Sequence, residues 1–172
     1  MSIAIRVARG LVLAAAAALM VPAGVLAVPP DHIPAAPVDL ELPAGDYCEH
    51  AVVLSNPTHK LHDTAYAPLP DGTFRYRSRG MATSRATDVV TGATLESGGG
   101  SALVFRFAAD GSIFVQGTGL LFVWYLPGDD SDLAPGLWLV HGRATETYAP
   151  DGSFIRATFS GHAIDVCAAL GA

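Results

Sequence analysis

The side chains able to do chemistry are scattered histidines and carboxylates, with no assembled catalytic motif. Three histidines on different predicted strands could meet a carboxylate at the mouth of a barrel and act as a general acid or base: His50, His141 and His162, with Glu49, Glu146 or Asp165. The sequence has no Gly-x-Ser-x-Gly nucleophile motif and no glycine-rich phosphate loop followed by a helix. Because an isolated histidine more often serves packing or the surface, we predict no catalytic residue.

Two segments carry residue types that bind metals, but neither has a complete ligand set. His59 and His62 are three residues apart, and on a strand such residues point to opposite sides. The acidic run 129–132 could offer oxygens to calcium, but it lacks the glycine and terminal glutamate of an EF-hand loop. We therefore interpret both segments as polar loops and predict no metal site and no cofactor.

Arginines alternate along one predicted strand. Arg75, Arg77 and Arg79 occupy one side of the segment 73–88, and Arg85 follows on the same side. Such a row could bind an anionic ligand or a polyanionic envelope component. It could instead pair with acidic residues of neighbouring strands, or discourage pairing at a sheet edge. Because the chain is acidic overall, we favour internal ion pairing.

The end of the predicted strand 112–126 is apolar on both faces, because Phe122 and Trp124 alternate with Val123 and Tyr125. The candidates for contact with a small apolar ligand are five aromatic residues: Phe122, Trp124, Trp138, Tyr76 and Phe105. An eight-stranded barrel is either filled by side chains or holds one small ligand, and we favour a filled interior. The second apolar face must then be covered by a loop, the preceding segment, another subunit or a ligand.

Turn signals and alternation predict an all-β domain that positions these residues. Asp-Gly pairs at 71–72, 110–111 and 151–152 lie between β-rich runs, and Asp-Gly is a strong hairpin signal. Glycines 98–100 are expected to form a turn, and 164–170 to end in a short helical turn. The expected strands are 47–54, 59–65, 73–88, 93–99, 101–108, 112–126, 136–148 and 153–166. About eight strands with short connections predict an antiparallel up-and-down sheet.

The two cysteines, Cys48 and Cys167, stand at opposite ends of the predicted domain. In an exported chain they are expected to form a disulfide. A closed loop of about 120 residues could stabilise the fold by up to about 4–5 kcal/mol. Joining the first strand to the last would also close the sheet and remove its exposed edges. We therefore prefer a β-barrel closed by this disulfide to the alternative, a β-sandwich.

The N-terminal segment has the pattern of a secretory signal peptide. Arg6 and Arg9 precede an uncharged apolar run, and small residues stand at the −3 and −1 positions of a cleavage site after Ala27. We predict export without a stable membrane anchor. Residues 28–45 contain five prolines and are expected to form a flexible lead-in, so that 46–172 is the single domain.

Composition excludes several classes of protein. Hydrophobic residues make up 51% of the chain and charged residues 15%, so the chain is not disordered. Loss of Arg6 and Arg9 would leave 8 basic against 16 acidic residues, a formal charge of −8. A surface that acidic is expected to repel nucleic acids and anionic membranes.

Several segments resemble those of uncharacterised secreted proteins of actinobacteria. They are the ending Asp165-Val166-Cys167-Ala168-Ala169-Leu170 and the segments 88–92 and 135–139. The shared motifs are structural turns and a disulfide, and the resemblance implies no activity. More loosely, it suggests a small calycin-like barrel, similar to lipocalins or allene oxide cyclase.

The sequence therefore predicts a secreted, non-enzymatic β-barrel module that binds a small apolar ligand or a partner in the cell envelope. The alternative is an isomerase or cyclase that works in the barrel cavity. Convergent histidines and carboxylates inside a sizeable cavity would favour that alternative.

Overall fold

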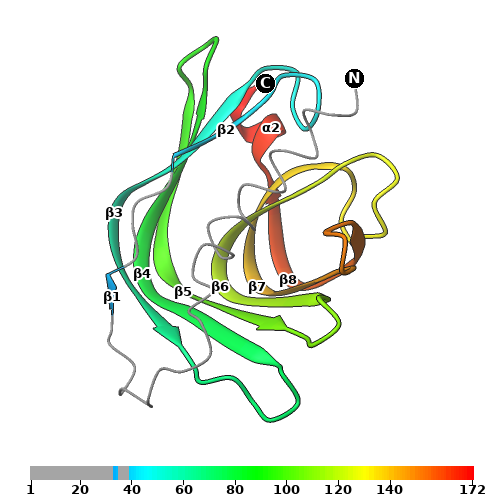
Figure 1. Ribbon diagram of the computed structural model, residues 1–172. Coiled ribbons are helices and arrows are strands. Elements are labelled where there is room, and N and C mark those ends of the chain that lie inside the picture. The colour runs from blue at the N-terminus through cyan, green and yellow to red at the C-terminus, as the bar shows by residue number, and fades with distance from the viewer. Residues whose placement is uncertain (1–32, 35–38) are drawn as a thin grey trace.

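The computed structural model describes residues 33–34 and 39–172, and this part of the chain is all-β with one short helix (Figure 1). The predicted signal peptide and most of the lead-in lie outside the described residues. The elements are β1 (Ile33–Pro34), β2 (Leu40–Leu42), β3 (Val52–Ala65), β4 (Phe74–Asp88), β5 (Thr94–Phe107), β6 (Ile113–Tyr125), β7 (Gly136–Tyr148), β8 (Phe154–Asp165) and α2 (Val166–Leu170).

The strands form one antiparallel up-and-down sheet in the order β1-β3-β4-β5-β6-β7-β8, with β2 also paired to β3. The all-β, antiparallel prediction is confirmed, and the three predicted Asp-Gly turns join β3 to β4, β5 to β6 and β7 to β8. In each turn the aspartate Oδ1 accepts a hydrogen bond from the backbone N–H two residues later. The folded part begins before residue 46, because β2 lies in the predicted lead-in and Leu42 is buried.

Two predicted boundaries are wrong. The end of the run 47–54, from Val52, and the run 59–65 belong to one strand, β3, which continues through an irregularity between Ser55 and Thr58. The runs 93–99 and 101–108 likewise form β5, so glycines 98–100 lie inside a strand. Pairing with Thr83, Ala82 and Met81 of β4 holds these glycines extended, and this ladder overrides the weak strand preference of glycine.

A row of directly opposed residues crosses the sheet where its strands bend: Leu61, Gly80, Ser101, Gly119, Gly142 and Gly161. We call it the glycine row. Gly80 and Gly161 have φ values of 150° and 136°. A Cβ at Gly80 would overlap the carbonyl oxygen of Lys60, and one at Gly161 that of His141. Glycine therefore permits a close strand approach and a sharp curvature along this line.

The glycine row separates two parts of the sheet. The hairpin half lies between the row and the three Asp-Gly turns, and the disulfide half lies on the other side. In the hairpin half the sheet is continuous from β3 to β8. Beyond the row, β5 and β6 separate: their pairing runs only from Ser101↔Gly119 to Phe107↔Ile113.

In the disulfide half, two sheets pack against each other. The sheet of β2–β5 and the sheet of β6–β8 enclose a buried core with α2: Leu42, Val52, Leu54, Ala86, Leu137, Leu139, Val166 and Leu170. This half is locally a sandwich, whereas the hairpin half is a curled barrel-like sheet. Both predicted architectures are therefore present in part.

A second core lies inside the curve of β6–β8. These strands bend so far that the Tyr125 ring, at the end of β6, is 5.9 Å from the ring of Phe154, at the start of β8. The loop 126–135 covers this core. Asp130 contributes its carbonyl oxygen to the backbone N–H of Ala157, and Leu133 packs against the buried residues. A covering loop is one of the alternatives predicted for the second apolar face.

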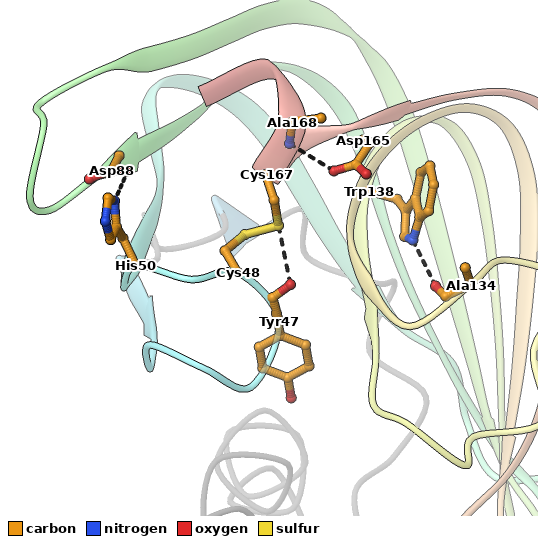
Figure 2. Close-up of a disulfide and its surroundings, with 9 residues drawn as sticks. All are labelled: Tyr47, Cys48, His50, Asp88, Ala134, Trp138, Asp165, Cys167 and Ala168. Carbon is orange, nitrogen blue, oxygen red and sulfur yellow. Dashed lines mark hydrogen bonds and ion pairs between the residues drawn. A yellow bond between two sulfur atoms is a disulfide. The ribbon is translucent and has the colours of Figure 1, made fainter. Parts of the chain in front are cut away.

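The disulfide is confirmed, and it joins the loop before β3 to α2 (Figure 2). The Cα atoms of Cys48 and Cys167 are 5.3 Å apart. Asp165 caps α2 by accepting the backbone N–H of Ala168. Among the described strands no ladder joins β8 to β3. A hydrogen-bonded ladder between the first and last strands was expected. The disulfide and the buried core around α2 instead hold the two ends of the curled sheet together.

Candidate functional site

The outer face of the hairpin half gathers most of the positive charge of the protein. Register places Arg75 beside Arg106, His62 beside Arg79, and Arg79 in one transverse line with Arg143. We call six residues on this side of the sheet the basic face: Arg75, Arg77, Arg79, Arg106 and Arg143 in the hairpin half, and Lys60 immediately across the glycine row. All but the half-buried Arg77 are exposed.

No acidic residue of the described strands shares this face in the hairpin half, and Asp130 and Asp132 reach it only from the loop 126–135, where they contact Arg156. Its other positions are occupied by His62, Arg156 and uncharged residues, and the nearby carboxylates of Asp63 and Glu146 belong to the inner face, as register with Ser78 and Val115 indicates. The chain as a whole carries a formal charge of −6. The charges are therefore segregated, and net charge does not describe the potential near this surface.

The cations of the basic face form no ion pair with a described carboxylate, unlike two other arginines. Arg85, in the disulfide half, lies 2.6 Å from Glu96, and Arg156 lies 3.0 Å from Asp130. Uncharged side chains contact several of these cations instead. Arg75 stacks 4.0 Å over the Tyr66 ring, and Arg143 donates to Gln116 at 3.1 Å.

The preference for internal ion pairing is therefore wrong for Arg75, Arg77 and Arg79 and holds for Arg85 alone. The edge-protection alternative is also wrong, because β4 lies between β3 and β5. The basic face also includes Lys60, Arg106 and Arg143, because antiparallel register places their side chains on the same side of the sheet as the arginines of β4. The register of the Asp-Gly hairpin at 71–72 could have found Lys60, whereas Arg106 and Arg143 depend on the β4–β5 and β6–β7 registers.

The five predicted ligand contacts are divided between opposite faces of the sheet. Tyr76 and Phe105 are paired on the inner face of the hairpin half, with ring centroids 5.9 Å apart. Phe122 and Trp124 pack against the core of the disulfide half. Trp138 packs against the second core and donates its indole N–H to the carbonyl of Ala134 (Figure 2). These residues do not line one cavity.

Two tyrosine–carboxylate pairs occupy the inner face. Burial and the nearby Asp63 carboxylate raise the pKa of Tyr76, and one Asp63 oxygen is buried without a hydrogen-bond partner. Burial and Glu146 likewise raise the pKa of Tyr125, whose hydroxyl lies 3.3 Å from that carboxylate. Both hydroxyls therefore stay protonated at neutral pH, and that of Tyr125 donates to Glu146.

The three candidate catalytic histidines do not converge. His50 lies 2.7 Å from the buried Asp88, whose pKa is lowered mainly by the backbone N–H of Thr91 and also by His50 (Figure 2). His141 and His162 do come together, directly opposite each other on β7 and β8. They line a pocket of about 270 Å³ at the point where β5 and β6 separate, and no carboxylate of the described residues belongs to its lining.

The acidic residues within 129–132 fix the loop 126–135 over the second core. Asp129 accepts the backbone N–H of Leu126, and Asp132 accepts that of Phe159. Asp130 forms the ion pair with Arg156. These carboxylates therefore have structural partners, which agrees with the interpretation as a polar loop. Within 39–172, no group of three or more potential metal ligands is found.

No family model, curated protein or solved structure matches this chain. In the described part of the chain, no helix has the length and apolar character needed to cross a membrane.

Proposed function

We propose that this protein is an exported, non-enzymatic module that binds a phosphate-bearing polymer of the cell envelope through its basic face. The observation that carries the proposal is a surface with six cations that have no acidic partner among the described residues, on a chain with a formal charge of −6. Guanidinium groups recognise phosphate oxygens through paired, charge-assisted hydrogen bonds. A binding partner with many anionic groups can engage several cations at once.

The geometry of the sheet suits an extended polymer. Alternate residues on a strand are roughly 6.8 Å apart, and neighbouring strands are about 4.8 Å apart. Arg75, Arg77 and Arg79 therefore form a line of charges, and Arg106 extends it sideways. Because like charges placed directly opposite destabilise a sheet, the pair Arg75 and Arg106 gains most from an anion that bridges them.

Export is part of the proposal and has two supports. The first 27 residues have the pattern of a signal peptide, and the disulfide agrees with an oxidising compartment. Outside the cell, an envelope polymer is a more accessible polyanion than a nucleic acid. The curled up-and-down sheet agrees with the proposed calycin-like relationship.

The division of the predicted aromatic contacts between two faces favours this partner over a small apolar ligand. A barrel-cavity isomerase or cyclase receives less support, because the histidine-lined pocket has no carboxylate in its lining.

The test compares two single variants with the same change in net charge. Arg79→Glu reverses an exposed cation of the basic face, and Arg85→Glu reverses a cation of the disulfide half that is paired with Glu96. Binding to immobilised inorganic polyphosphate is measured over a range of salt concentrations. We expect the first variant to lose at least tenfold in affinity and to show a shallower salt dependence.

The second variant should bind like the unmodified protein. Equal affinity for all three proteins, with thermal unfolding unchanged, would reject the proposal. Stronger binding to single-stranded DNA than to polyphosphate would redirect it to nucleic acid.

A further inference from the structure

The histidine-lined pocket exists because the sheet divides beside a tract of glycines. On one side are glycines 98–100 of β5, whose lack of side chains leaves space. On the other side are Leu120, Leu139, His141, His162 and Ile164 of the sheet β6–β8. Leu139 is buried, whereas both histidines are exposed at the pocket wall. The pocket thus has an apolar floor and a nitrogen-bearing rim.

The histidines are held in register by an unusually close strand contact. They are directly opposed, and the next opposed pair along the strands is Gly142 and Gly161. A Cβ at Gly161 would overlap the carbonyl oxygen of His141 itself, and one at Gly142 would overlap that of Ser160. Directly opposed residues of antiparallel strands have Cβ atoms about 4.5–5.5 Å apart. Two imidazoles at that spacing can converge on one point.

We propose that His141 and His162 together bind one divalent late-transition-metal ion at the rim of this pocket. Neutral imidazole nitrogen is a preferred ligand of copper, zinc and nickel, and the order of intrinsic affinities places Cu²⁺ first. The protein supplies two ligands from rigid strands. The remaining coordination positions face the pocket and are open to water or a small anionic ligand.

The site lies just across the glycine row from the basic face, because Arg143 follows His141 by two residues on the same side of β7. His141 and His162 lie in the disulfide half, among apolar residues and glycines. His50 is engaged with Asp88. His62 lies directly opposite Arg79, so no second imidazole stands across from it. His62 therefore provides a control with a single imidazole on the same face of the sheet. The inference does not depend on the proposed envelope partner.

Titration of the full exported chain with Cu²⁺, followed by calorimetry, tests the proposal. We expect one equivalent to bind, and His141→Ala and His162→Ala each to weaken binding at least tenfold. Because both imidazoles hold the same ion, the double variant should bind no more than about twofold more weakly than either single variant, a clear failure of additivity. Electron paramagnetic resonance of the copper complex should show coupling to two nitrogens.

His62→Ala should leave the affinity unchanged, and thermal unfolding establishes that every variant is folded. Two results would overturn the proposal. One is an unmodified protein that binds Cu²⁺ no more tightly than the double variant. The other is a stoichiometry of two equivalents that falls to one in each single variant, because that result means that the two histidines bind separate ions.

Discussion

The two halves of the sheet are built from the same strands but differ in their packing and in the pairing of their charges. The disulfide half has two packed sheets, a helix, a covalent bond and a buried core. Its exposed cation Arg85 is paired with Glu96. The hairpin half is a single curled sheet whose outer face carries five arginines without an acidic partner among the described residues, and Lys60 lies immediately across the glycine row. The comparison indicates that stability is concentrated in one half and binding in the other.

The glycine row explains how one set of strands can serve both purposes. Strands of 12 to 15 residues cross both halves. They change direction at the row, and beyond it β5 and β6 separate. The glycine row therefore marks the boundary between the packed half and the exposed half, while each strand continues across it.

Removal of the disulfide is expected to have the largest effect on stability. Cys48→Ser/Cys167→Ser frees a loop with a sequence separation of 119 residues, and the free energy of unfolding should fall by up to about 4–5 kcal/mol. Chemical denaturation measures this loss. At temperatures where the variant is still folded, binding to polyphosphate should be retained, because the basic face lies in the other half. Loss of binding by a folded variant would contradict the separation of the two roles.

Substitution within the glycine row should have the next largest effect. Gly161→Ala places a Cβ against the carbonyl oxygen of His141 at a φ of 136°, and we expect a loss of about 3 kcal/mol. Gly92→Ala is the matched control, because Gly92 has a φ of 72° but open space around it. Its expected cost is about 1–2 kcal/mol, from the backbone conformation alone. If both substitutions lowered the free energy of unfolding equally, the close approach of the strands would not be the reason for glycine in the row.

Local patterns in the sequence were sufficient for much of the fold. The Asp-Gly turns marked the three hairpins because aspartate accepts a backbone hydrogen bond there. Two cysteines in a chain predicted to be exported implied the disulfide. Residues whose position depends on register could not be assigned in the same way. Gly80 and Gly161 are far apart in sequence and become one row only after four pairings are fixed.

The same limit applied to the candidate sites. Alternation placed Arg75, Arg77 and Arg79 on one face, but their partners depended on which residues lie opposite them. Treating 98–100 as a turn broke β5 in two and hid the alignment of Arg106 with Arg75. The pairing of His141 with His162 likewise follows from the register of β7 and β8. Net charge was misleading for a related reason, since it averages a surface that the fold segregates.

Single charge removals should have the smallest effects on stability, with opposite signs in the two halves. Arg106→Gln relieves the like-charge contact with Arg75, and the free energy of unfolding should rise by roughly 0.2–1 kcal/mol. Arg85→Gln removes an exposed ion pair and should lower it by roughly 0.2–1 kcal/mol. Denaturation at low salt measures both changes, and added salt should reduce them because it screens exposed charges. If Arg106→Gln lowered stability as much as Arg85→Gln, the stacking of Arg106 over Phe114 would outweigh the repulsion. The basic face would then be a stabilised part of the fold, and the contrast between the two halves would lose its electrostatic basis.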